Sequence, residues 1–414
     1  MRGNLILAAW LPGLTALAVS AVAQVAPPAP DAFALHDGDR VVLVGDGLIE
    51  RAQHYGFVEL ALTTRWPNRN VTFRNVGWSG DTVFGEARDH YTNPPTAFDH
   101  LIEQITTPRP TVTVFGYGGA MAYEAPDAIP AFVEGYHRLL DTLGVAGARC
   151  VLLAPAPHEQ RASPHPDVAS LNARLEATRD AIAGVAADRR CWFVDVFAGL
   201  QERYRSRETP LTTNGIHLDE AGYIQVARLL EDDLAQAPRS TLVVVDFESG
   251  VAHGARLVQG IEIVDLGERS IQNPGPSNVG ITYRFNLIAE ALPMEGSRVL
   301  IIKGLGQGGS YTLSSGGVVL AQAPAEVWAN GVRITHPVER TQVEALRRAI
   351  IEKNQLYFRQ YRPQNETYLV GFRRYEQGQN ADELGQLDPL IGEKENEIGR
   401  LRVPQALVFT LTRQ

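Results

Sequence analysis

The chain has 414 residues, 44% of them hydrophobic, and a formal net charge of -9 with an isoelectric point near 5.6. This length is too great for one hydrophobic core of ordinary size, so two or three domains are expected. The acidic balance argues against a nucleic-acid or anionic membrane partner, because either needs clustered Lys and Arg. Small ester or sugar-like ligands remain open.

Residues 1–23 have the pattern of a secretory signal peptide. Arg2 precedes an apolar run from Leu5 to Val19, and Ala21–Ala23 forms a small-residue cleavage site. A transmembrane anchor is the alternative, but the run is short and is interrupted by Pro12-Gly13. We therefore expect a periplasmic or secreted protein with no membrane partner after cleavage, and a proline-rich linker over residues 24–36.

Residues 37–236 alternate strand and helix signals, which predicts an α/β domain with a parallel sheet. The clearest helix runs from about Asp127, a good N-cap, to Leu143, and others carry apolar stripes over 168–182 and after His217. Five strands are predicted, at Val41–Gly45, Val71–Val76, Thr111–Gly116, Cys150–Pro155 and Trp192–Phe197.

The rest of the chain changes character twice. Residues 237–335 are rich in β-branched and aromatic runs separated by Gly and Pro, which predicts a small β-sandwich, either a carbohydrate-binding module or a spacer. Residues 336–414 predict a helical region. Within it, the polar segment Arg362–Arg373 either covers the mouth of the first domain or is a solvated connection.

Four short blocks carry the chemistry of the first domain. Val44-Gly45-Asp46-Gly47 ends an apolar strand, and Trp78-Ser79-Gly80-Asp81-Thr82 follows the next strand. Phe115–Met121 forms the third block, and Asn214-Gly215-Ile216-His217 precedes the last helix of the domain. Ligands of open α/β sheets lie outside the carboxyl ends of the strands, where these blocks would meet.

These blocks resemble the SGNH, or GDSL, hydrolase family, which implies a flavodoxin-like three-layer sandwich with a five-stranded parallel sheet. The resemblance implies His217 as the catalytic base, although a surface histidine is the alternative. Gly80 corresponds to the oxyanion glycine and is also explained as a turn glycine. We expect the ligand-contacting residues to be Asp46, Ser79, Asp81 and His158.

Three family positions are substituted in this sequence. Gly47 stands at the nucleophilic serine, Ala120 at the oxyanion asparagine, and Asn214 at the aspartate that orients the histidine. Shifting the alignment by one residue recovers none of them. Ser79 is the only hydroxyl beside Gly80 and is a weak candidate for a substitute nucleophile.

The whole layout looks like a group of exported SGNH-like proteins of planctomycete-type bacteria whose nucleophile turn also varies. Two functions therefore stay open: an ester hydrolase acting on acylated carbohydrate, or a pseudohydrolase that binds a glycan or acyl group. No cofactor or metal is expected, since His158-Glu159 fits cleft lining better than a ligand pair. The oligomeric state cannot be inferred.

Cys150 and Cys191 each precede a predicted strand. In a flavodoxin-like order 2-1-3-4-5 these strands are neighbours, about 4.8 Å apart. That spacing suits a disulfide, which should form in an exported protein. Two free buried thiols are the alternative.

Overall fold

The computed structural model describes residues 32–89, 94–144, 149–161, 167–235, 242–247, 261–265, 269–271, 281–289, 292–306, 308–363 and 381–414. The predicted signal peptide, residues 1–23, lies outside the described residues, as does most of the predicted linker. The last residues of that linker differ from the prediction. Phe33 and Leu35 are buried in the first core, and the backbone N–H of Phe33 donates to the carbonyl of Leu234 at 2.9 Å.

A five-stranded parallel sheet forms the centre of the first domain, in the predicted order β2-β1-β3-β4-β5. Its strands are β1 (Arg40–Gly45), β2 (Thr72–Asn75), β3 (Val112–Gly116), β4 (Arg149–Leu153) and β5 (Trp192–Val194). β5 is shorter than predicted because Asp195 caps the next helix, with its carboxylate accepting from the N–H of Ala198 at 2.9 Å.

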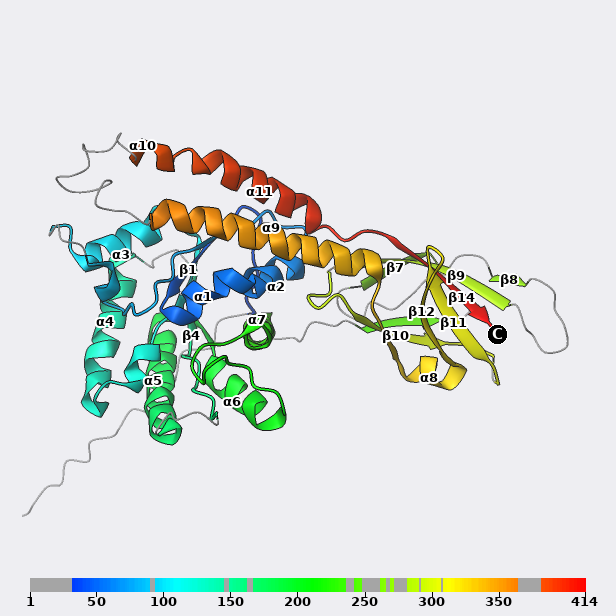
Figure 1. Ribbon diagram of the computed structural model, residues 1–414, viewed down its shortest axis with the longest axis horizontal. Helices are drawn as coiled ribbons and strands as arrows, with labels where there is room; N and C mark the ends of the chain where they lie inside the picture. The colour runs from blue at the N-terminus through cyan, green and yellow to red at the C-terminus, as the bar shows by residue number, and fades with distance from the viewer. Residues whose placement is uncertain are drawn as a thin grey trace, which may run out of the picture.

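Helices cover both faces of this sheet, as Figure 1 shows. Alternate residues of β1 enter opposite cores: Val41 and Leu43 one, Val42 and Val44 the other. The first core is shared with α1 (Gly47–Tyr55), α2 (Phe57–Arg65), α6 (Val196–Ser206) and α7 (Glu220–Ala235). The second is shared with α3 (Ala97–Thr106), α4 (Ile129–Thr142) and α5 (Val168–Arg189). The sheet and its two helical layers form the predicted three-layer α/β fold.

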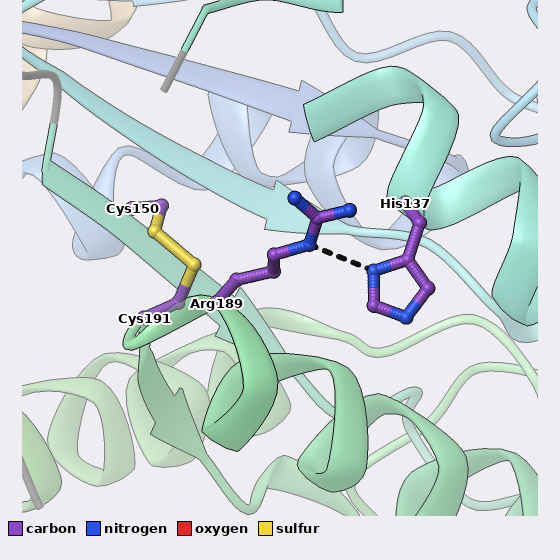
Figure 2. Close-up of a disulfide and its surroundings, with 4 residues drawn as sticks. All are labelled: His137, Cys150, Arg189 and Cys191. Carbon is purple, nitrogen blue, oxygen red and sulfur yellow. Dashed lines mark hydrogen bonds between the residues drawn. A yellow bond between two sulfur atoms is a disulfide. The ribbon is translucent and has the colours of Figure 1, made fainter. Parts of the chain in front are cut away.

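The predicted bond between Cys150 and Cys191 is confirmed (Figure 2). It joins the starts of the neighbouring strands β4 and β5, with a Cα–Cα distance of 4.9 Å. Beside it, Arg189 at the end of α5 donates through Nε to Nδ1 of His137 on α4 at 2.9 Å. α4 begins at Ile129 rather than Asp127, because residues Pro126–Ala128 form a 3-10 turn before it.

Two sheets make up the β region at the opposite end of the molecule from α4 (Figure 1). β13-β10-β6 forms one, and β12-β11-β14-β9-β7 the other, with β8 paired to β9. Their inward side chains share one hydrophobic cluster. Their strands are β6 (Leu242–Asp246), β7 (Ile261–Asp265), β8 (Arg269–Ile271), β9 (Ile281–Ala289), β10 (Arg298–Lys303), β11 (Ser310–Ser315), β12 (Val318–Pro324), β13 (Val332–Ile334) and β14 (Leu407–Arg413).

One of these strands lies in the region predicted to be helical. β14 alternates buried Leu407, Phe409 and Leu411 with more exposed residues, which is the pattern of a strand with one buried face. It pairs antiparallel with both β9 and β11. The helical region of residues 336–414 therefore ends in a strand of the β region, which is a correction to the prediction.

The C-terminal helices connect the two parts of the molecule. α9 (Pro337–Tyr361) and α11 (Leu387–Leu401) run side by side along the long axis in Figure 1, with α10 (Ala381–Leu384) before α11. Near its start, α9 places Glu339 against Arg298 of β10 at 2.6 Å, and both side chains are buried. Further along, Lys353 pairs with Glu59 of α2 at 2.6 Å, with 1% and 4% of these side chains exposed. These two buried ion pairs thus connect α9 to the β region and to the α/β domain.

Candidate functional site

The four predicted blocks meet at the carboxyl edge of the central sheet, around a cavity of about 330 Å³. Every predicted site residue lines this cavity except Asn214. The predicted residues that line it are Asp46, Gly47, Ser79, Gly80, Asp81, Ala120, His158 and His217. The topology explains their proximity, because parallel strands deliver all their following loops to the same edge.

The side chain of Asp46 connects the first block to the third through hydrogen bonds. Its carboxylate caps α1 by accepting from the N–H of Leu48 at 3.0 Å and also accepts from the N–H of Gly119 at 2.9 Å. Burial raises its pKa to about 6, and the charge of Asp81 adds to this, while the two N–H donors act in the opposite direction. Asp46 therefore positions two loops of the cavity.

We expect Asp46 to make stability depend on pH near 6. Its folded-state pKa lies above the ordinary value of 3.8, so its contribution to stability is fully present below about 4 and is lost as the pH rises through about 6. Urea unfolding of wild type and Asp46→Asn at several pH values should show a difference that changes by about 1.4 kcal/mol per pH unit within this window. A difference that stays constant with pH would contradict the assignment.

Gly47, at the position predicted for the nucleophile, has no side chain. It begins α1, and a Cβ atom built there would meet only the hydroxyl of Ser79, at 3.5 Å. The site thus has room for a serine that the chain does not carry. Ser79 is exposed, and its backbone N–H donates to the carboxylate of Glu50. Its hydroxyl is the side-chain atom that a Cβ at position 47 would approach.

Gly80 and Asp81 have structural reasons for their identities. Gly80 adopts a left-handed φ of +82°, which glycine accommodates without strain. Asp81 is 1% exposed, forms an ion pair with Arg88 at 2.8 Å and accepts from the hydroxyl of Tyr117 at 3.0 Å. Its carboxylate is therefore occupied by protein donors, although Asp81 borders the cavity.

The loop that carries His217 is held by a buried carboxylate. Glu159 accepts from the backbone N–H groups of Leu211 and Thr212, both at 3.0 Å, and from the hydroxyl of Thr212. Its own N–H donates to the carbonyl of Gly215 at 2.8 Å. Glu159, predicted beside His158 as cleft lining, thus shapes the turn before the histidine.

Asn214 stabilises the backbone around His217. Its side-chain oxygen accepts from the N–H groups of Ile216 and His217 at 3.1 and 2.8 Å. The His217 ring itself is exposed, and its pKa is lowered below 6.5 by partial burial and by the positive charge of Arg51. A neutral imidazole at physiological pH can accept a proton.

The cavity also has lining residues that the sequence analysis did not identify. Tyr223 of α7 stacks on Tyr55 with ring centroids 4.8 Å apart and donates its hydroxyl to the carbonyl of Leu48 at 2.9 Å. Tyr123, 58% exposed, lies 5.7 Å from the ring of His158. Arg51 of α1 also lines the cavity. Its position four residues after Gly47 in one helix was the available sequence signal.

The predicted cover segment is described only at its start. Arg362 lies 3.7 Å from the ring of Trp78 and pairs with Glu50 at 3.3 Å, while Tyr361 donates to the carbonyl of Gly77 at 2.8 Å. Residues 364–373 lie outside the described residues, so the cover stays a prediction. The residues at the end of α9 nevertheless contact the second block of the site.

The described part of the chain contains no group of three or more His, Cys, Asp or Glu side chains that could hold a metal ion. No helix there has both the length and the apolar character needed to cross a bilayer.

Comparisons with known proteins agree with the predicted family. A model of the GDSL-like lipase/acylhydrolase family matches residues 43–224. No curated protein sequence matches the chain significantly. The fold is similar to that of BT4096, a gut microbial diltiazem-metabolizing enzyme, with 15% identity, a TM-score of 0.68, and coverage of 92% of this chain and 98% of that one.

Smaller proteins match part of the chain. Axe2, an acetylxylan esterase from Geobacillus stearothermophilus, has 15% identity and a TM-score of 0.39, covering 48% of this chain and 95% of its own. LAE5, an alpha/beta hydrolase from the metagenome of Lake Arreo, has 18% identity and a TM-score of 0.39, covering 50% and 99%. Residues 43–224 thus match the GDSL-like lipase/acylhydrolase, or SGNH hydrolase, family, and their parallel α/β sheet is the fold expected from that match.

Proposed function

We propose that the cavity recognises a small ester or an acylated carbohydrate without forming a serine acyl-enzyme. The observation that carries this proposal is position 47, where the family places its nucleophile and this chain has a glycine inside an otherwise ordered cavity. The acyl-hydrolase family supports an ester as the recognised group. The similar fold of a diltiazem-metabolizing enzyme supports a small molecule as the ligand.

The substitutions at positions 47, 120 and 214 would each strongly lower the rate of a serine-esterase reaction. Loss of the nucleophile costs on the order of 10⁶ in rate, an Asp-to-Asn change beside the histidine about 10⁴, and one oxyanion donor about 10² to 10³. These effects belong to one catalytic unit and do not multiply. A binding protein of pseudohydrolase type is therefore the first candidate.

Slow hydrolysis is a second candidate, and it is supported by His217. The ring is exposed, lines the cavity and has a lowered pKa, so it is available as a general base toward water. Gly80 lines the same cavity, and the family resemblance assigns its backbone N–H as a donor to the developing oxyanion. In this reaction water attacks the ester directly, and no covalent intermediate forms.

Export is part of the proposal. The signal pattern of residues 1–23 predicts it, and the Cys150–Cys191 bond supports it, because disulfides persist in oxidising compartments. We therefore assign the protein to the periplasm or the external medium.

The proposal is tested with wild type, His217→Ala and Ser79→Ala. We expect no stoichiometric labelling by a serine-directed fluorophosphonate, and acetyl-ester turnover that is slow, lost in His217→Ala and retained in Ser79→Ala. Any such turnover should decline only below pH 6.5, as the imidazole becomes protonated. Robust wild-type turnover together with labelling of a serine would overturn the proposal, and loss of that labelling in Ser79→Ala would identify the nucleophile.

A further inference from the structure

Arg51 lies on the same face of α1 as Gly47. The two residues are four apart in the helix, and side chains of a helix lean toward its N-terminus, over the preceding turn. Because Gly47 has no side chain, the space over the first turn is open to the Arg51 side chain. Both residues line the cavity.

The guanidinium of Arg51 has no counter-ion in the part of the protein that the structure describes. Among the described residues no carboxylate forms an ion pair with it, and its Nε is buried without a hydrogen-bond partner. The neighbouring Glu50 is occupied by Arg362 and by the N–H of Ser79. Leaving a buried donor of a charged group unsatisfied is unfavourable, so a ligand that supplies acceptors would gain binding energy there.

The carboxylates that border the cavity do not neutralise this charge. Asp46 accepts from two backbone N–H groups, and Asp81 is paired with Arg88. The charge of Arg51 also reaches His217 and Tyr223, since it lowers the pKa of each, although burial raises the pKa of Tyr223 overall. Arg51 therefore acts on the part of the cavity where an ester would be bound.

We propose that the cavity takes a ligand that carries a carboxylate close to its acyl group, and that Arg51 binds this carboxylate. A guanidinium matches a carboxylate with two parallel hydrogen bonds. The chemical class that fits is an acylated sugar acid rather than a neutral acylated sugar. This inference rests on the proposed recognition of an acyl group and adds the charge of the ligand.

Two probes that differ only in charge test this. They are the methyl glycoside of 4-O-acetyl-glucuronic acid, whose acetyl group lies next to the carboxylate, and the matching 4-O-acetyl glucoside, titrated into the full chain while the His217 ring signal is followed by NMR. We expect the acid to bind wild type at least about tenfold more tightly than the neutral sugar, a difference of about 1.4 kcal/mol. High salt should weaken the binding of the acid and leave the neutral sugar unchanged.

The variants are Arg51→Gln and Arg51→Lys, with Arg340→Gln as the control for net charge. Arg340 is exposed on α9 and, among the described residues, pairs with Glu344 at 2.9 Å. We expect Arg51→Gln to bind both sugars within about twofold of each other, Arg51→Lys to keep part of the preference, and the control to keep all of it. Should Arg51→Gln fail to fold, the salt titration of wild type tests whether charge drives the preference, and a smaller preference in Arg51→Lys assigns it to Arg51.

The outcomes separate this inference from the proposed function. If both sugars bind wild type equally, or if Arg51→Gln keeps the preference, the role of Arg51 is overturned while recognition of the acyl group stands. If neither sugar binds, both are overturned. A preference for the acid that is lost with Arg51→Gln and retained in Arg340→Gln supports both.

Discussion

The triple variant Gly47→Ser, Ala120→Asn, Asn214→Asp is expected to hydrolyse acetyl esters at least about 100-fold faster than Gly47→Ser alone. Serine fits at position 47, where a Cβ would meet only the Ser79 hydroxyl at 3.5 Å. Without the other two changes, the serine lacks an oxyanion donor and a carboxylate that stabilises the imidazolium. Side chains at positions 120 and 214 are exposed, so larger or charged groups have room.

Initial rates with an acetyl ester, and labelling by a fluorophosphonate, measure this gain. The matched control is the triple variant with His217→Ala added, which should lose both signals because the serine then has no base. If Gly47→Ser alone reaches the rate of the triple variant, then Ala120 and Asn214 do not limit catalysis. That result would contradict the explanation given for their loss.

Replacing Lys353 by alanine is expected to lower the free energy of unfolding by about 3–5 kcal/mol, because it leaves a buried carboxylate without its partner. Lys353 donates to Glu59 at 2.6 Å and to the carbonyl of Phe73 at 3.0 Å. Burial raises the pKa of Glu59 and lowers that of Lys353, so the pair depends on its mutual attraction and hydrogen bonds. Urea unfolding of the full chain measures the loss.

Lys394→Ala is the matched control on the neighbouring helix. Lys394 pairs with Glu352 at 2.6 Å, but both side chains are partly exposed, so its removal should cost about 0–1 kcal/mol. Replacing Lys353 and Glu59 together by methionine should cost less than Lys353→Ala, since no charge is then left buried. Equal losses for Lys353→Ala and Lys394→Ala would show that burial of the first pair is unimportant.

Local patterns were sufficient for much of the α/β domain. The apolar run Val41–Val44 and its four counterparts gave strands whose order follows from the flavodoxin-like fold, and the paired positions of Cys150 and Cys191 then gave the disulfide. The blocks around Gly47, Gly80 and His217 meet in one cavity because the fold brings these loops together. At each of these positions the local sequence pattern was sufficient to predict the structure.

The remaining features depend on contacts and on local geometry that residue types do not reveal. Asp81 accepts from Arg88, further along the same loop, and from the hydroxyl of Tyr117, which follows β3, so the occupied carboxylate could not be predicted from its own block. Asn214 was predicted to stand at a substituted triad position. Its hydrogen bonds to backbone N–H groups depend on the local geometry of the loop, which the residue type does not reveal. β14 alternates correctly for a strand, yet its short run follows a helix and was included in the helical region.

The insertion of β14 between β9 and β11 has a consequence for how the chain is made. As the polypeptide leaves the ribosome, residues 281–289 and 310–315 emerge long before 407–413, the segment that pairs with both. Until then the sheet is divided, and β9 and β11 each present an unpaired edge that can associate with other chains. The β region therefore completes its folding only after residues 407–413 have emerged, whereas the residues around the cavity emerge much earlier. A nascent or truncated chain lacking residues 407–413 would be prone to aggregate through the β region.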